Sequence, residues 1–170
     1  ALLDDDVLAW HLSVDTKPMF LRQLLDIRQM MEPKAAAWAA LHGTDAQHAD
    51  IEAAQIRMEE ESHSIEDFVV ADALFHRTIL RAANNEILLS MEGVIFSALL
   101  SSIRLTNRDP RENVSSIPFH RKVLDAIKAR DHKQAEKMMN DHLSDTSQRL
   151  KSALGETPGG VISNGGPRTD

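Results

Sequence analysis

Apolar residues recur every three or four positions along most of this chain, which is the spacing of one buried face of an α-helix. We expect a helix over each of six segments: residues 18–41, 45–61, 65–83, 86–106, 117–129 and 131–154. A shorter apolar and acidic stretch over residues 2–12 predicts one or two further helical turns. No segment convincingly indicates a strand, so the pattern predicts an all-α fold.

Short connections between helices make consecutive helices antiparallel neighbours. The expected architecture is therefore an antiparallel helical bundle of six long helices plus a short leading helix. The segment 86–106 is apolar on nearly all sides, which is typical of a helix at the centre of a bundle or in an oligomer interface.

Turn-forming residues mark where several of these helices should end. Pro33 interrupts the first long segment, and we expect a kink there because proline removes one backbone donor. Gly43 is suited to the position after a helix and Thr44 to the N-cap of the next. Asn84 suits a left-handed residue at a helix end, and Asn85 can cap the helix that follows.

Two further sequence pairs resemble capping boxes, in which a side chain at the helix start bonds a backbone N–H three residues on. One is Ser64 with Asp67, and the other is Asp131 with Gln134. They place helix starts near residues 65 and 132.

The chain is long enough for one domain with a substantial core. Residues 1–154 form that domain in our interpretation, with a polar loop over 107–116 and Ser116 as the cap of the helix after it. Residues 155–170 are rich in Gly and Pro and should form a flexible C-terminal tail.

The composition agrees with a helical fold and excludes several function classes. Hydrophobic residues make up 42 % of the 170 residues and aromatic residues 4 %, without any Tyr, and Cys is absent, so thiolate metal sites are excluded. The net charge of −7 is unfavourable for wrapping phosphate backbone without a separate basic module. No apolar run approaches the roughly 20 residues of a membrane span, and we expect a cytoplasmic location. The acidic start lacks an initiator Met, which suggests a processed piece or fragment.

Asp72 and His76 are the first candidates for chemistry, because they are polar residues inside an amphipathic helix. At a spacing of four, their side chains point the same way, with roughly 5–6 Å between Cβ atoms. The two can pair with each other or share a metal ion.

His120 and His142 also lie on or beside apolar stripes of their helices. Imidazoles aimed into a core are unfavourable unless each finds a partner. A divalent cation bound by Asp72 and three histidine nitrogens would satisfy all of them, and such a set suits zinc, nickel or manganese. Three separately hydrogen-bonded core histidines are the alternative. The other histidines are read as solvated or capping residues or have no acidic partner four residues on: His11, His42, His48, His63 and His132.

Two arginines lie among core residues. An inward arginine requires a carboxylate or phosphate partner. For Arg28 this is either Glu32, four residues on, or a bound organic acid. Arg104 lies near the end of the most apolar helix.

Other catalytic and binding templates are absent. Glu60 and His63 form a single Glu-x-x-His pair, whereas a di-iron bundle requires two such pairs and two more Glu. No His-Glu-x-x-His, no Gly-x-Ser-x-Gly and no phosphate-binding glycine loop occurs. We therefore do not expect an enzyme, although a metal-dependent helical-bundle hydrolase or oxygenase is the alternative, since the same ligands could activate a water.

A series of short motifs resembles the ligand-binding (FCD) domain of FadR-type regulators in the GntR family. The motifs occur in the expected order, at residues 3–10 (LDDDVLAW), 27–33 (IRQMMEP), 72–76 (DALFH), 83–85 (ANN), 119–131 (FHRKVLDAIKARD) and 140–143 (NDHL). The resemblance extends over residues 2–154. The leading segment with Trp10 is closer to sugar-acid regulators of the galactonate type than to fatty-acid or lactate ones.

The resemblance implies a dimeric all-α bundle that senses small carboxylates for a bacterial transcription regulator. The family's metal site and its effector-binding arginines would fall on Asp72, His76, His120, His142, Arg28 and Arg104. Sugar acids such as an aldonate are the expected effectors, with zinc the first choice of metal. An N-terminal winged helix-turn-helix that would bind DNA is not part of this chain, which fits the acidic charge.

Overall fold

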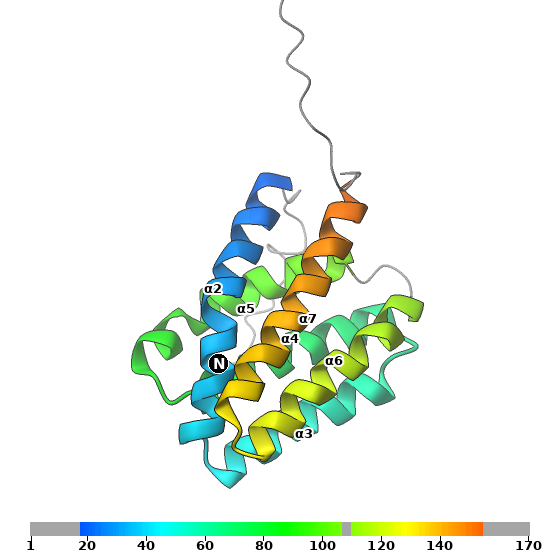
Figure 1. Cartoon of the computed structure of the whole chain (residues 1–170). Coiled ribbons are helices and arrows are strands. Elements are labelled where there is room, and N and C mark those ends of the chain that lie inside the picture. The colour runs from blue at the N-terminus through cyan, green and yellow to red at the C-terminus, as the bar shows by residue number, and fades with distance from the viewer. Residues whose placement is uncertain (1–17, 107–109, 155–170) are drawn as a thin grey trace, which may run out of the picture.

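The computed structural model describes residues 18–106 and 110–154 of the chain. These residues form six helices and no strand: α2 (Pro18–His42), α3 (Asp45–Glu60), α4 (Ile65–Ala82), α5 (Glu86–Thr106), α6 (Pro110–Lys128) and α7 (His132–Ala153) (Figure 1). The prediction of an all-α fold is confirmed. The short helix expected over 2–12 and the tail over 155–170 lie outside the described residues.

Helix α4 occupies the centre of the bundle and packs against α2, α3 and α5. Helices α2 and α7 run side by side in opposite directions, and α7 also packs on α6 (Figure 1). The sequence explains why α4 is central, because its Phe68, Phe75, Ile79 and Leu80 are almost completely buried. Phe68, Phe75 and Ile79 are spaced by seven and four residues and Leu80 follows Ile79 directly, so the four side chains lie on adjoining faces of one helix.

The second half of α2 packs closely because its buried side chains are small. Ala35, Ala36, Ala39 and Ala40 have no exposed surface and belong to the main core. Small side chains let neighbouring backbones approach closely, and alanine has the highest helix propensity. This segment therefore holds α2 firmly against the bundle.

Most of the predicted helix ends are confirmed. Thr44 caps α3 in a complete capping box with Gln47, and Ser64 accepts a hydrogen bond from the Asp67 N–H at the start of α4. The Asp131 carboxylate accepts a hydrogen bond from the Gln134 N–H, 3.0 Å away, and so caps α7. These side chains satisfy backbone donors that a helix start leaves free.

The junction between α4 and α5 follows the predicted pattern. Asn84 has a φ of 51°, in the left-handed region. The Oδ1 of Asn85 accepts hydrogen bonds from Ile87 N–H at 3.0 Å and Leu88 N–H at 3.1 Å. Asn84 thus reverses the chain and Asn85 starts the next helix.

One expectation about helix limits is wrong. Helix α6 begins at Pro110, so residues 110–116 are helical and Ser116 lies inside the helix, where its hydroxyl donates to the Asn113 carbonyl. Proline is favourable in a first helical turn, which allows this earlier start. Pro33 lies inside α2, which is one helix from Pro18 to His42, and the expected kink at Pro33 stays a prediction. The buried alanines after Pro33 offset the missing hydrogen bond.

His48 differs from the expected solvated residue. It is buried, and one ring nitrogen lies 2.8 Å from the Ala39 carbonyl, where it acts as a donor to the end of α2. The expected capping role therefore holds, while the expected exposure does not.

Candidate metal centre

Three helices of the bundle bring the predicted metal ligands together in the core. Asp72 and His76 lie one turn apart on α4, His120 lies on α6 and His142 on α7. All four side chains are buried. One ring nitrogen of each histidine lies within 4.8 Å of the others, so the three imidazoles converge on a common point.

The Oδ1 atom of Asp72 joins two of these rings. It lies 3.2 Å from His76 Nε2 and 3.1 Å from His120 Nε2. His142 Nε2 in turn lies 3.3 Å from His76 Nε2. One carboxylate oxygen and three imidazole nitrogens thus form a compact polar cluster.

The position of the proton on His120 follows from its neighbours. Its Nδ1 lies 2.9 Å from the Ser116 carbonyl, which only accepts hydrogen bonds, so Nδ1 carries the proton. In the neutral ring Nε2 then presents a lone pair toward Asp72 Oδ1. Two acceptors face each other in a dry core, an arrangement that requires either a second ring proton or a cation between them.

Helix α2 adds a buried ion pair to the same cluster. Arg28 Nε donates to Glu32 Oε1 at 2.7 Å, and Arg28 Nη2 lies 3.3 Å from His76 Nε2. Arg28 Nη1 is buried without a hydrogen-bond partner among the described residues. The partner of Arg28 is therefore the protein carboxylate four residues on, with one guanidinium nitrogen left over.

Glu32 is the site residue that sequence reasoning placed only beside Arg28. Its Oε2 also lies 2.8 Å from His76 Nδ1, so it contacts both the arginine and a candidate metal ligand. The signal in the sequence was its spacing from Arg28; the contact with α4 arises only from helix packing.

Burial and charge together set the ionisation of the cluster. Burial alone would raise the pKa of Glu32, but Arg28 and His76 lower it to about 2. For Asp72 burial also opposes ionisation, and His120 and His76 outweigh it and hold the pKa well below its usual value. Both carboxylates are therefore ionised at neutral pH.

The histidines respond differently to the same surroundings. Burial lowers the pKa of a histidine, but at His76 the Glu32 and Asp72 carboxylates outweigh burial and raise the pKa. At His142 burial, aided by His120 and His76, lowers the pKa well below its usual value. His142 is therefore neutral, the form in which imidazole binds metals.

The residues present fit a divalent cation. Their donor set is three imidazole nitrogens and one carboxylate oxygen, which borderline transition metals prefer. The Nδ1 of His142 is buried and has no hydrogen-bond partner among the described residues, and the facing lone pairs of His120 and Asp72 point to a missing positive charge. Arg104 lies in α5, but its side chain is outside the described part of the structure, so it is not placed relative to this cluster.

The cluster lies behind a small surface crevice. Arg28 and Glu32 line this crevice of about 10 Å³ together with Leu24, Ile27, Met31 and Leu80. That space holds about one water molecule. The Arg28–Glu32 pair thus separates the histidines from the surface.

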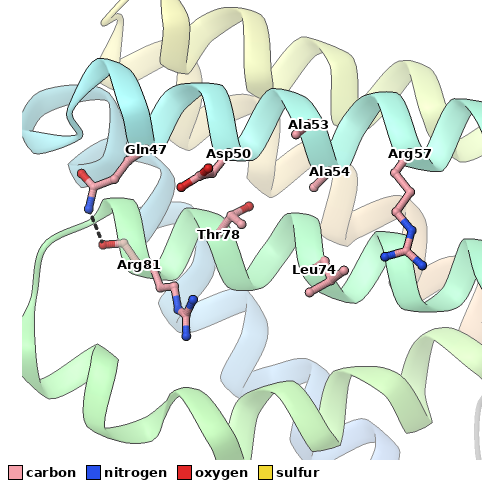
Figure 2. Close-up of a pocket in the computed structure, with 8 residues that line it drawn as sticks. All are labelled: Gln47, Asp50, Ala53, Ala54, Arg57, Leu74, Thr78 and Arg81. Carbon is pink, nitrogen blue, oxygen red and sulfur yellow. Dashed lines mark hydrogen bonds between the residues drawn. The ribbon is translucent and has the colours of Figure 1, made fainter. Parts of the chain in front are cut away.

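A larger groove of about 410 Å³ lies elsewhere, between α3 and α4 (Figure 2). Its polar lining includes Gln47, Asp50, Arg57 and Arg81, and Figure 2 shows the Gln47 amide bonded to the Arg81 carbonyl. None of the candidate metal ligands lines this groove, and the Arg81 guanidinium already contacts Glu92 at 2.9 Å.

Comparison with known proteins identifies this arrangement of helices. Residues 23–145 match the FCD domain family. The chain belongs to that family. The FCD match covers α3, α4, α5 and α6 completely and most of α2 and α7, so it includes every helix that contributes to the histidine cluster.

Curated relatives of this FCD domain are transcription regulators. The galactonate operon transcriptional repressor of Escherichia coli (strain K12) is 29 % identical over 150 residues, which are 88 % of this chain and 66 % of the repressor. The Glc operon transcriptional activator of the same strain is 25 % identical, covering 79 % of this chain and 57 % of the activator. The transcriptional repressor NanR of Salmonella newport (strain SL254) is 28 % identical, covering 78 % and 52 %. The chain spans just under two-thirds of the first relative and less of the others.

Solved structures with the same fold include Escherichia coli McbR/YncC, with a TM-score of 0.69, 19 % identity and coverage of 79 % of this chain and 65 % of that one. Streptococcus agalactiae GntR has a TM-score of 0.64, 22 % identity and coverage of 81 % and 61 %. This FCD domain is thus a ligand-sensing domain of the kind found in GntR-family regulators, and its relatives are not enzymes. Among the described residues, no helix has the length and apolar character needed to cross a bilayer.

Proposed function

We propose that this FCD domain senses a small carboxylate through a divalent metal ion held by Asp72, His76, His120 and His142. The observation that carries the proposal is the convergence of one ring nitrogen from each of His76, His120 and His142 on one buried point, with Asp72 Oδ1 close to two of these rings. Zinc is the first choice for this donor set, with nickel and manganese as alternatives. A metal-free core with one protonated imidazole is the competing explanation of the same geometry.

The effector in this proposal is a sugar acid such as an aldonate. Arg28 supports the choice, because its unpartnered Nη1 is a buried donor suited to a carboxylate. A bound divalent ion would supply coordination positions for carboxylate or hydroxyl oxygens of the effector. Arg104 remains a proposed second anchor. The name of the galactonate operon repressor makes D-galactonate the first compound to test.

The response to the effector would pass to a DNA-binding module outside this chain. The curated relatives are longer than the chain, and we propose that the additional part is an N-terminal winged helix-turn-helix. The crevice beside Arg28 holds about one water molecule, so an effector would enter only with a shift in helix packing. Through a homodimer this shift would change the spacing of two such modules. The sensing and dimerisation unit would extend over residues 1–154 of a cytoplasmic regulator, followed by the flexible tail 155–170.

Metal analysis of the protein, purified without a metal-affinity column, tests the site directly. We expect about one divalent ion per chain in the wild type, and Tm to rise with sugar acids. A ligand at 100 times its dissociation constant adds about 2.7 kcal/mol to the free energy of unfolding.

His120→Ala removes one proposed ligand, and we expect metal content and D-galactonate affinity to fall together. His48→Ala is a matched control, because His48 is equally a buried histidine but bonds the Ala39 carbonyl outside the cluster. This control should keep its metal even where its Tm falls. An unchanged metal content in His120→Ala would contradict the site assignment.

A further inference from the structure

The buried site contains a fixed set of charges among the described residues. Arg28 contributes one positive charge, while Asp72 and Glu32 contribute one negative charge each. Metal-binding histidines are neutral. A divalent ion at the proposed position would add two positive charges, which leaves one positive charge in excess.

We propose that Glu32 sets this excess at one, so that the site selects an effector carrying a single carboxylate over the corresponding dicarboxylate. The inference rests on the metal-dependent sensing proposed above and adds the charge class of the effector. A monocarboxylate brings the buried site to neutrality, whereas a neutral analogue leaves the excess charge and a dicarboxylate reverses it.

Glu32 is suited to this role because both of its oxygens are held in place. Oε1 accepts a hydrogen bond from Arg28 Nε at 2.7 Å, and Oε2 lies 2.8 Å from His76 Nδ1. The side chain is 2 % exposed, so its charge is not screened by solvent. It therefore remains a permanent part of the site and does not swing out when an effector arrives.

The same pairing leaves one edge of the Arg28 guanidinium for the effector. Glu32 takes the edge with Nε, and the remaining Nη1 is buried without a partner. A single carboxylate can use that donor. A second carboxylate on the same molecule would be buried without an equivalent cation, which is unfavourable in a region of low dielectric constant.

Other charged pairs of the described residues near the cluster do not alter the count, and Arg104, the proposed second anchor, is taken to contact the effector outside this buried site. Arg149, two turns beyond His142 on α7, has its Nε 3.0 Å from Asp145 Oδ2 and forms with Asp145 a pair of zero net charge. Lys34 and Glu136 form an exposed pair between α2 and α7, also of zero net charge. Exposed pairs of this kind contribute little to the field in the core.

The wild-type protein alone gives the first test. Metal-loaded protein is titrated calorimetrically with galactitol, D-galactonate and galactarate, which share one open six-carbon chain and carry zero, one and two carboxylates. We expect D-galactonate to bind at least about tenfold more tightly than either of the others, since each unmatched buried charge is a substantial penalty. Galactarate that binds as tightly as D-galactonate overturns the inference.

Variants of Glu32 test whether its charge is the cause. Glu32→Gln keeps the shape of the side chain but raises the excess to two positive charges, so the preference for D-galactonate over galactarate should fall at least about tenfold. Glu32→Asp keeps the charge and shortens the chain, so it should preserve the preference even if both affinities fall. Glu92→Gln is the matched control, because Glu92 also contacts two arginines, Arg77 and Arg81, but outside the cluster.

The possible outcomes separate this inference from the proposed function. Absence of bound metal in elemental analysis overturns the proposed function, and the charge count with it. Metal present with an unchanged affinity ratio in Glu32→Gln overturns only the role of Glu32. A ratio that changes equally in Glu32→Asp and Glu32→Gln shows that geometry and not charge sets the preference, and also overturns the inference.

Discussion

At the scale of single residues, position 43 requires a glycine because neighbouring atoms leave no room for a Cβ atom. Its backbone angles do not require one. Its φ lies outside the left-handed region. A Cβ atom at this position would lie 2.4 Å from the Ala39 carbonyl oxygen and 2.6 Å from His48 Nε2. The buried His48 ring therefore packs where the side chain of any other residue would be.

Gly43→Ala should lower the free energy of unfolding by about 1–3 kcal/mol, because the Ala39 backbone carbonyl has to shift. Urea denaturation measures the change. Gly93→Ala is the control: a Cβ at Gly93 meets no atom within 4 Å, and alanine in a helix should stabilise by about 0.5–1 kcal/mol. Equal effects of the two substitutions would contradict the close approach at Gly43.

The candidate ligands could be selected from the sequence because polar residues inside apolar helical stripes are conspicuous. Asp72, His76, His120 and His142 all stood out in this way, and the structure places them in one buried cluster. The second contact of Glu32 could not be predicted, because spacing along α2 shows its relation to Arg28 but not its distance from a side chain on α4.

At the scale of helices and their connections, local capping chemistry predicted most helix ends. Thr44, Ser64, Asn85 and Asp131 each act through a side-chain oxygen within a few residues, so the sequence suffices. The start of α6 was missed because Ser116 is also a good N-cap, and residues 110–116 are polar. Their helical state depends on tertiary packing, such as the buried Asn113, whose amide donates to the Ser62 carbonyl.

Asn84 connects two of these junctions, so its substitution should show how they are stabilised. Its Nδ2 donates to the His42 carbonyl at 2.9 Å, and its Oδ1 accepts from Gln47 Nε2 at 2.8 Å. Asn84→Gly keeps the left-handed backbone and should lose about 1–2 kcal/mol with these hydrogen bonds. Asn84→Ala should lose about 1 kcal/mol more, because alanine is strained at a positive φ.

Thermal or urea unfolding of both Asn84 variants gives this comparison, with circular dichroism confirming an unchanged helix content. Equal loss in the two variants would show that the hydrogen bonds alone matter. The larger loss in Asn84→Ala is the result expected if the backbone angle also contributes.

At the scale of the whole molecule, the histidine cluster joins side chains from four helices that are far apart in the sequence. Asp72 and His76 come from α4, His120 from α6 and His142 from α7, while Arg28 and Glu32 come from α2. Sequence patterns predicted the helical bundle and contacts between consecutive helices, but not the pairing of helices distant in the chain, such as α2 with α7. Long-range packing decides this, and the proposed ion would therefore stabilise the native arrangement of the bundle and not one helix.

Removal of the proposed metal should lower stability cooperatively. After treatment with a chelator we expect Tm to fall by about 5–10 °C, because an ion that binds only the folded state adds to its stability. Scanning calorimetry measures the shift, and addition of zinc should restore it. The chelator should have little effect on His120→Ala, and an equal fall in that variant would contradict stabilisation through the cluster.

The position of Pro33 inside α2 determines where this helix bends most easily. It lacks a backbone N–H, so the Gln29 carbonyl has no partner four residues on, and α2 bends most easily there. Glu32 directly precedes this point, and Arg28 is little more than one turn away. From Pro33 to Pro18 the helix is about 22 Å long, so a bend of about 5° moves its far end by about 2 Å. A small bend of α2 at Pro33, close to the Arg28–Glu32 pair, would therefore produce a much larger displacement at the N-terminal end of the helix.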